Sequence, residues 1–335
     1  MPQPTALITG MCGQDGILLA RHLSSLNYRV VGTVLPHQTA MHTIYCPSAT
    51  AVVLDVTDTK ALNRLLIDLQ PDEIYHLAAR SSVRESWNDP IGVTEVNALA
   101  PLHLLDCVRD ERDTSGWNPV IVQASSSEMF GLAETLPQRI TSPHHPRSPY
   151  ASAKSFAFHT TVNYRESFGL KCVNAVMFNH ESALRPQAFV TRTISRGAAE
   201  ISLGRRQSLT LGTLDVRRDW GSAHDYVQAL HVIATSPELR DYVVATGVSR
   251  SLTDFVGTAM TMAGIEDWED RVVSDPTRAR PAEVFETRGD ANPIAHELGW
   301  TPTTSFDRII ERMLDVDRER LITGIEHHPS YALSP

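Results

Sequence analysis

Tyr150 and Lys154 are the residues whose types and spacing best suit chemistry. They stand four positions apart, so a helix through them places both side chains on one face, one turn apart. Tyrosine is a poor base at neutral pH, but a nearby lysine ammonium favours the phenolate and lowers the pKa of the phenol. Such a pair could take the proton of an alcohol while hydride leaves the same carbon. Because most pairs at this spacing are solvated helix faces, the interpretation depends on what lies upstream.

A glycine-rich turn near the N-terminus is the first upstream feature. The apolar run 5–9 predicts a buried strand, and apolar residues at helical spacing follow over 17–26. Between them, Gly10 would permit a tight turn, Gly13 the close approach of a pyrophosphate, and Gly16 close packing of helix on strand. The N–H groups that open the helix would hold the phosphates. This stretch therefore predicts a nucleotide-binding turn.

A serine-rich stretch that ends in a carboxylate is the second upstream feature. The apolar run 119–124 predicts a strand, and Ser125, Ser126, Ser127 and Glu128 follow at its end. Serines at a strand terminus are often only turn formers, and any one of these three could be no more than that. Glu128 is harder to explain in this way, since a carboxylate there would face a bound nicotinamide.

The remaining strands of the first half end in residues that could meet a cofactor. Four more strands are predicted, over 28–34, 51–54, 73–79 and 173–178. The residue after the second strand usually selects the cofactor, because an acid holds a free 2'-hydroxyl and an arginine holds a 2'-phosphate. The stretch 35–38 offers neither. Asp55 would lie beside the adenine or cap the helix 60–69, and Asn97 would brace the active-site backbone or lie on the surface.

Regular alternation of strands and helices up to residue 178 predicts the fold class. It indicates an α/β protein with a Rossmann-type doubly wound parallel sheet. From residue 179 the alternation is lost and arginines become more frequent. We expect a dinucleotide-binding domain over 1–178 and a smaller C-terminal α/β lobe over 179–335 that mainly binds substrate. Segments around 214–250 are expected to return to the first domain.

Composition narrows the range of partners. The net charge of −9 argues against nucleic acid or an anionic membrane, and an anionic substrate would need local arginines. The cysteines lie far apart without metal-ligand spacing, so we expect reduced thiols and no metal site. Neither an export signal nor a membrane-spanning run is read from the sequence. A cytoplasmic protein is the expectation.

Several longer stretches carry a resemblance to a known family. They are Ala6–Gly16, Gln123–Gly131, Pro146–Tyr150, Asn163–Glu166, Phe178–Ser182, Phe189–Arg192, Leu214–Gly221 and Arg280–Glu283. On these stretches the chain resembles the extended short-chain dehydrogenase/reductases, and within them the GDP-mannose 4,6-dehydratase family. The stretches Phe-Asn-His-Glu-Ser and Arg-Asp-Trp-Gly are specific to this branch, whereas the glycine turn and the Tyr/Lys pair are shared by many activities.

The resemblance implies a dehydratase reaction on the sugar of a nucleotide-diphosphate sugar. Tyr150, tuned by Lys154, would take the proton of the 4-hydroxyl, and Ser126 would hydrogen-bond the same oxygen. Hydride would leave C4 for the cofactor, water would be lost across C5 and C6, and hydride would return to C6. Because the ketone at C4 acidifies C5, the carboxylate of Glu128 would suffice as the base there. The implied catalytic residues are Ser126, Glu128, Tyr150 and Lys154.

The resemblance also implies two sets of binding residues. The cofactor, NADP with NAD not excluded, would be bound by Gly10, Cys12, Gly13, Gln14, Asp15, Gly16, Asp55, Val56, Leu77, Ala78, Ala79, Ser81, Tyr150, Lys154, His180 and Arg185. The substrate, expected to be GDP-mannose, would be bound by Ser81, Ser127, Asn179, Val190, Arg218, Arg280 and Glu283. Arg218, directed by a compact turn over 219–221, would converge with Arg280 on the diphosphate, while Glu283 reaches the ribose. A homo-oligomer, dimer or tetramer, is expected.

Departures from the family pattern keep two alternatives open. Leu35-Pro36-His37 stand where the family has Arg-Arg-Ser, a loop linked to 2'-phosphate binding and tetramer contacts. Arg80 replaces a glutamine, the stretch 183–186 replaces Pro-Arg-Arg-Gly, and Thr193 replaces a lysine, so another sugar or nucleotide remains open. An NDP-sugar 4-reductase or epimerase would need the Tyr/Lys pair but no C5 base. A non-enzymatic nucleotide-binding regulator would need no catalytic set at all.

Overall fold

A seven-stranded sheet forms the centre of the computed structural model, which describes residues 3–275, 277 and 282–335. The strand order is β10-β6-β5-β4-β1-β2-β3, and every neighbouring pair is parallel. This confirms the predicted Rossmann-type sheet. The strands are β1 (Thr5–Thr9), β2 (Arg29–Val34), β3 (Thr50–Val53), β4 (Glu73–His76), β5 (Val120–Ser126), β6 (Cys172–Met177) and β10 (Tyr242–Val244).

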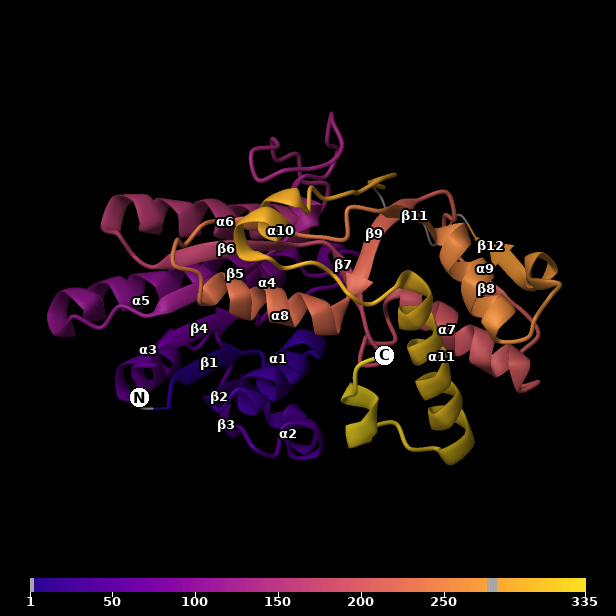
Figure 1. Cartoon of the computed structure of the whole chain (residues 1–335), viewed down its shortest axis with the longest axis horizontal. Helices are drawn as coiled ribbons and strands as arrows, with labels where there is room; N and C mark the ends of the chain where they lie inside the picture. Colours follow the sequence, from indigo (N-terminus) through magenta and orange to yellow (C-terminus); the bar gives the residue numbers. More distant parts are fainter. Residues whose placement is uncertain (1–2, 276, 278–281) are drawn as a thin grey trace.

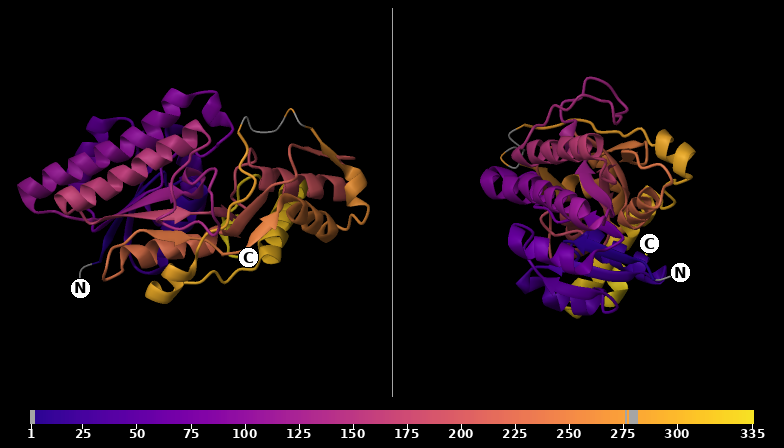
Figure 2. Two further views of the ribbon diagram at one scale, coloured as in Figure 1. Left: turned by 90° about the horizontal axis from the view of Figure 1, so that it is seen from above. Right: turned by 90° about the vertical axis from the view of Figure 1, so that its left-hand side faces the viewer.

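Helices cover both faces of this sheet because alternate strand residues point to opposite sides. Ala6 and Ile8 share a core with α1 (Gln14–Ser25) and α8 (Ala223–Ala234). Leu7 shares a core on the other face with α3 (Thr59–Leu69) and α5 (Ala100–Ser115). The helix α6 (Pro149–Phe168) packs beside α5, and Figure 2 shows the two long helices side by side. Short helices α2 (Thr39–Tyr45) and α4 (Pro90–Thr94) complete this half.

The strand order reverses between β1 and β4, and this reversal positions the site. Chain segments leave the carboxyl ends of these two strands in opposite directions, so a crevice opens there. The strand β4 ends at His76, three residues earlier than predicted. The N–H groups of Leu77 and Ala78 donate to the hydroxyl of Thr9, each at 3.1 Å, so they leave the ladder and curve over the crevice.

The second half of the chain adds a lobe beside the large sheet (Figure 1). Its core joins Ile194, Leu209, Phe255 and Met313. A three-stranded sheet in the order β11-β9-β7 lies between this lobe and the large sheet. The elements are β7 (Asn179–Glu181), α7 (Val190–Ser202), β8 (Leu209–Leu211), β9 (Arg217–Ser222), β11 (Ser249–Ser251), α9 (Leu252–Met262), β12 (Val272–Ser274), α10 (Asn292–Leu298) and α11 (Phe306–Thr323).

Two elements from the second half belong to the large sheet. The strand β10 pairs with β6, and α8 packs against α1. The exact division of the chain into a dinucleotide domain and a substrate lobe stays a prediction.

The helical stretch Pro90–Ser115 is long and apolar enough to pass a length-and-composition test for a membrane span. Half of its most apolar window is buried inside the protein, and Leu104, Leu105 and Val108 pack on the sheet. Burial against the sheet therefore accounts for the apolar character of this stretch.

Candidate active site

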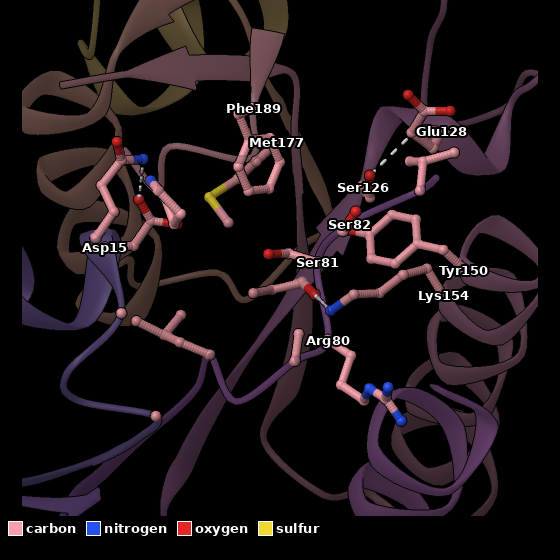
Figure 3. A pocket seen from close by; sticks show the side chains of 18 of the residues that line it. Asp15, Arg80, Ser81, Ser82, Ser126, Glu128, Tyr150, Lys154, Met177 and Phe189 are labelled. Atoms are coloured by element: carbon pink, nitrogen blue, oxygen red, sulfur yellow. Dashed lines mark hydrogen bonds between the residues drawn. The ribbon is translucent and has the colours of Figure 1, made fainter. Parts of the chain in front are cut away.

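A cavity of about 830 Å³ occupies the crevice at the carboxyl ends of the strands. Its wall is built by segments that follow β1 to β6 and by segments of the second lobe. Figure 3 shows Asp15 on one side of this pocket and Tyr150 with Lys154 on the other. All the predicted catalytic residues line it, and so do all the described cofactor and substrate residues except Cys12.

The glycine turn has the geometry that a tight strand-to-helix connection requires. Gly10 has φ +70°, and a Cβ there would lie 2.8 Å from the Cα of Ala78. A Cβ on Gly16 would lie 2.5 Å from the carbonyl oxygen of Gly10. Gly13 has an ordinary φ of −72°, and a Cβ there would meet only that same oxygen at 3.4 Å. The protein itself therefore requires the first and third glycines, while the second leaves room beside the turn.

The N-terminus of α1 is open toward the cavity. Its N-cap residue is Gly13, and no side chain caps the helix. The first N–H groups of a helix lack partners inside the helix and carry the positive end of its dipole. This end of the cavity is therefore suited to phosphate groups, as the sequence predicted.

The helix α6 places Tyr150 and Lys154 side by side in the cavity wall. It begins sharply because the Ser148 hydroxyl accepts from the N–H of Ala151 at 3.1 Å and Pro149 occupies the first turn. Both reactive residues are buried, with 8% and 3% of their surface exposed. The Lys154 ammonium donates to the carbonyl of Ala124 at the end of β5, 2.9 Å away.

Burial dominates the proton affinities of this pair. It raises the pKa of Tyr150 to about 12, while a hydrogen bond with Ser126 and the charge of Arg185 act in the opposite direction. Burial also lowers the pKa of Lys154 to about 8. The pKa of Tyr150 is therefore raised in this structure, whereas the spacing to Lys154 predicted a lowered value. Removing charge from water outweighs the attraction that the spacing suggested.

Ser126 and Glu128 lie beside Tyr150 at the end of β5. The strand continues to Ser126, two residues beyond the predicted run, and a short 3-10 helix follows over Ser127–Met129. The Ser126 hydroxyl accepts from the N–H of Glu128 at 3.3 Å (Figure 3). Ser126 thus shapes the turn and also reaches Tyr150. Ser125 also lines the cavity, and its hydroxyl donates to Asn174 at 2.8 Å.

A closed set of polar contacts joins α1 to β7 at the opposite side of the cavity. The His180 ring contacts Asp15 Oδ2 through Nε2 at 2.9 Å and the carbonyl of Phe178 through Nδ1 at 2.6 Å. The Gln14 amide donates to Asp15 Oδ1 and to the His180 carbonyl, and its oxygen accepts from Ser182. These contacts hold the first turn of the helix against the strand that follows the sheet.

Arg185 projects toward the same region from the loop after β7. Its Nε lies 3.1 Å from the carboxylate of Glu181, which is fully buried, and its guanidinium stacks 3.7 Å from the centre of the Phe189 ring. The Arg185 carbonyl accepts from Arg192 at 2.9 Å. An acid, an aromatic ring and a second arginine therefore fix both the backbone and the side chain of Arg185.

Arg218 and Glu283 meet at the second-lobe end of the cavity. Their side chains form an ion pair at 3.0 Å and are 6% and 16% exposed. The expected compact turn after Arg218 is wrong, since residues 217–222 form the strand β9. A strand fixes the direction of Arg218 by alternation, and its neighbour Arg217 points to the more exposed side. Arg280 lies outside the described residues.

Other predicted residues have simple structural roles. Asp55 lines the cavity but caps no helix, because Asp58 accepts the N–H of Ala61 at the start of α3. Asn97 braces the active-site backbone, donating to the carbonyl of Arg80 at 3.1 Å and accepting its N–H at 2.9 Å. The buried Cys12 thiol donates to the Gln38 carbonyl at 3.5 Å, and Cys12 is not among the described lining residues, so its place among the cofactor contacts stays a prediction.

The sequence analysis missed two residues that shape the site. The Thr9 hydroxyl bends the segment after β4, and the buried carboxylate of Asp219 accepts from Thr246, Gly247 and Gly289. For Asp219 there was little signal in the sequence, because the strand Arg217–Ser222 also carries two arginines and a serine. For Thr9 there was no signal, because a hydroxyl at a strand end is common. Figure 3 also places Met177 and Phe189 in the pocket wall.

Comparison with known proteins agrees with this geometry. Residues 7–313 match the family model described as GDP-mannose 4,6 dehydratase. The chain is 40% identical over 329 residues to GDP-mannose 4,6 dehydratase 2 of Arabidopsis thaliana, covering 95% of this chain and 88% of that protein.

Solved structures share the fold at lower identity. RMD from Pseudomonas aeruginosa, complexed with NADPH, has a TM-score of 0.80 at 24% identity and covers 95% of this chain and 100% of its own. DesIV, a dTDP-glucose 4,6-dehydratase from Streptomyces venezuelae with NAD and TYD bound, has a TM-score of 0.82 at 22% identity and covers 95% and 98%. The family-model match over residues 7–313 and the 40% identity over nearly the whole chain show that this chain belongs to the GDP-mannose 4,6-dehydratase family.

Proposed function

We propose that the protein is a nucleotide-diphosphate-sugar 4,6-dehydratase that converts GDP-mannose to GDP-4-keto-6-deoxymannose. One observation supports this most strongly. Tyr150, Ser126 and Glu128 line the same cavity as the glycine turn, so a tyrosine base and a carboxylate base would face one sugar bound there. A 4-reductase or epimerase on this scaffold would have no task for that carboxylate, and a regulator would need neither.

The residues present fit a dinucleotide. The open N-terminus of α1 and the space beside Gly13 suit a pyrophosphate, and Leu35 and Asp55 line the end of the cavity where an adenosine would lie. The cofactor, when bound, accepts hydride from C4 of the sugar and returns it to C6. We propose NADP on the family's precedent, with NAD as the alternative. Among the described lining residues between 33 and 57 there is no lysine or arginine to meet a 2'-phosphate.

Tyr150 removes the proton of the sugar 4-hydroxyl in the proposed reaction. The hydroxyl of Ser126 lies within reach of the Tyr150 phenol and would donate to the same sugar oxygen. Lys154 is anchored to Ala124 and presents its ammonium to the cavity from below the tyrosine. A cation in so dry a site stabilises the developing phenolate more strongly than it would in water.

Glu128 removes the C5 proton once C4 is a ketone. The ketone makes that proton acidic, and loss of water from C6 completes the elimination. The main chain of Glu128 is held by Ser126, so the alcohol base and the C5 base are fixed by one turn. Because both bases are held in fixed positions, they can act one after the other on the same bound sugar.

The substrate's diphosphate would lie toward the second lobe. Arg218 and Glu283 line that end, with Ser81, Ser127, Asn179 and Val190 between it and the catalytic turn. Arginine suits phosphate because its planar fork makes bidentate contacts. We propose that Arg218 holds the diphosphate and Glu283 a ribose hydroxyl, and the convergence of Arg280 on the same group stays a prediction.

The wider biological setting is also a proposal. We propose a dinucleotide domain over 1–178, a substrate lobe over 179–335, a homo-oligomer of two or four chains, and a cytoplasmic location. The described residues include no group of three histidine, cysteine or acidic side chains that could hold a metal ion.

Incubation with a panel of nucleotide-diphosphate sugars tests the proposed function. The expected result is a product of GDP-mannose that is lighter by one water, seen by mass spectrometry. A product of unchanged mass and altered stereochemistry would indicate an epimerase. Loss of water from another nucleotide sugar in preference to GDP-mannose would refute the assigned substrate but would still support a dehydratase reaction.

A further inference from the structure

The imidazole of His180 faces a hydrogen-bond acceptor at each of its two ring nitrogens. The Phe178 carbonyl lies 2.6 Å from Nδ1, and Asp15 Oδ2 lies 2.9 Å from Nε2. A neutral imidazole carries only one N–H, so it would set a lone pair against one of these oxygens. Only a ring with two N–H groups satisfies both contacts.

Asp15 is placed as a carboxylate. Its Oδ2 meets His180, and its Oδ1 accepts from the Gln14 amide at 3.1 Å. The Gln14 amide nitrogen also donates to the His180 carbonyl, and the Gln14 amide oxygen accepts from the Ser182 hydroxyl. Burial raises the pKa of Asp15, but the charge and hydrogen bond of His180 outweigh it, so the pKa of Asp15 is lowered and the proton of the Asp15–His180 contact belongs to the ring.

The surroundings favour a cation on this ring. The fully buried Tyr226 of α8 lies against it, with ring centres 5.0 Å apart and planes tilted by 34°. An aromatic face attracts a cation. Burial opposes the charge, the Asp15 carboxylate from α1 favours it, and the Arg185 cation opposes it, with the pKa of His180 raised on balance. The buried Glu181 beside Arg185 completes the charged groups here.

We propose that His180 is an imidazolium that serves as a positioning residue, holding the Asp15 carboxylate in place and neutralising it beside the phosphate-binding turn. The role rests on the dinucleotide site proposed above, and it differs from direct contact with the cofactor. Both ring nitrogens are already used within the chain, so the side chain has no N–H left for a ligand.

The physical need for this cation follows from where Asp15 stands. It lies in the first turn of α1, where a negative charge is favourable to the helix itself but repels an incoming pyrophosphate. The charge of Asp15 also acts on Tyr150 and Lys154 across the cavity. An imidazolium at 2.9 Å cancels most of this field while keeping the helix start fixed to β7.

Nitrogen-15 NMR of the full chain, labelled at histidine, tests the protonation state directly. At pH 7 the ring signal that disappears in His180→Gln should show two protonated nitrogens and should titrate at a higher pH than the other histidine rings. A neutral His180 ring at pH 7 would overturn the proposal. This readout requires neither cofactor nor sugar, so it is independent of whether the proposed reaction occurs.

NADPH binding to the full chain, followed by its fluorescence as a function of pH, tests the role. Affinity should fall roughly ten- to a hundredfold as pH rises through the His180 titration, and by a similar factor at pH 7 in His180→Gln. In Asp15→Asn the pH-dependent fall should largely vanish, although Lys154 still titrates there. An unchanged pH profile in Asp15→Asn would contradict the neutralising role.

His231→Gln is the matched control for these measurements. His231 is a half-buried histidine of α8 that contacts Tyr28 at 3.2 Å, and it is not among the described residues that line the cavity. This variant should keep the wild-type NADPH profile. If His180→Gln fails to fold, Asp15→Asn, which preserves shape, still decides the question through its pH profile.

Discussion

The ammonium of Lys154 is anchored to the main-chain carbonyl of Ala124, 2.9 Å away, at the end of the strand that carries Ser126. The Tyr/Lys pair of one helix is thereby tied to the serine turn of the neighbouring strand. Anchoring fixes the position of the cation, while burial lowers the pKa of Lys154 to about 8.

The first prediction is a gain of stability in Lys154→Met. Between pH 8 and 10.5 the unfolded chain holds a proton that the folded chain has lost, so this lysine's contribution to stability rises with pH there. Below that window the buried charge costs most. Measured without dinucleotide by urea unfolding, the variant should gain about 1–3 kcal/mol at pH 7 and much less near pH 10.

Two outcomes separate this prediction from general effects of the mutation. The exposed Lys171→Met should change little at either pH. An equal gain for Lys154→Met at both pH values would contradict the burial argument. Turnover should be lost in the same variant.

The second prediction concerns Glu128→Gln. The variant keeps shape but cannot remove the C5 proton, so oxidation at C4 should continue while elimination stops. Reduced cofactor should then accumulate at 340 nm on adding GDP-mannose. Dehydration should fall by roughly 100- to 10,000-fold. The exposed Glu134→Gln serves as the control, and elimination at a near wild-type rate in Glu128→Gln would remove this residue from the mechanism.

The third prediction concerns the grip on the substrate diphosphate. Arg218→Ala should raise the apparent substrate KM roughly ten- to a hundredfold, as expected for one lost charge-assisted contact of about 1.5–3 kcal/mol. NADPH affinity should hardly change. Arg217→Ala is a matched control, because Arg217 is the next residue along the strand but its side chain is 48% exposed and pairs with Glu286. Equal KM values for the two variants would refute the assignment.

The fourth prediction concerns Asn97. Replacing it with Ala leaves both the N–H and the carbonyl of Arg80 without their partner, at a cost of about 1–3 kcal/mol for each group that stays dry. Hydrogen exchange at the Arg80 amide should accelerate accordingly. Asn88→Ala, at an exposed position near this segment, should leave that rate unchanged. Unaltered exchange in Asn97→Ala would show that Asn97 does not stabilise the backbone at Arg80.

The fifth prediction identifies the cofactor. Denaturing the purified protein should release NADP, which mass spectrometry identifies without any assumption about activity. Recovery of NAD alone would refute the preference. It would also fit the absence of lysine and arginine among the described lining residues that follow β2 and β3.

The sequence predicted the strands well because their information is local. The apolar runs at Ala6 and at Ile121 fill the two cores of one sheet, and glycine spacing predicts a turn whose backbone no other residue fits. The catalytic residues could be found for the same reason. They lie in two short stretches, 126–128 and 150–154, and both stretches line the same cavity.

Properties that depend on distant contacts could not be predicted. The direction of the pKa shift of Tyr150 depends on burial by other elements, among them the segment that carries Val93 and Ala98, which spacing does not reveal. The pairing of Arg218 with Glu283 joins residues 65 positions apart. The early end of β4 depends on a hydroxyl 68 positions away, at Thr9. In each case the decisive partner belongs to another element.

The return of the chain to the large sheet after β9 has a consequence for how the molecule can be divided. The strand β10 covers the outer edge of β6, and α8 covers an apolar face of the sheet together with α1. A fragment that stopped at Phe178 would expose both the edge and the face, which are the surfaces that drive strand-to-strand aggregation. The nucleotide-binding half is therefore completed by residues that are synthesised only after the first segment of the second lobe, residues 179–222.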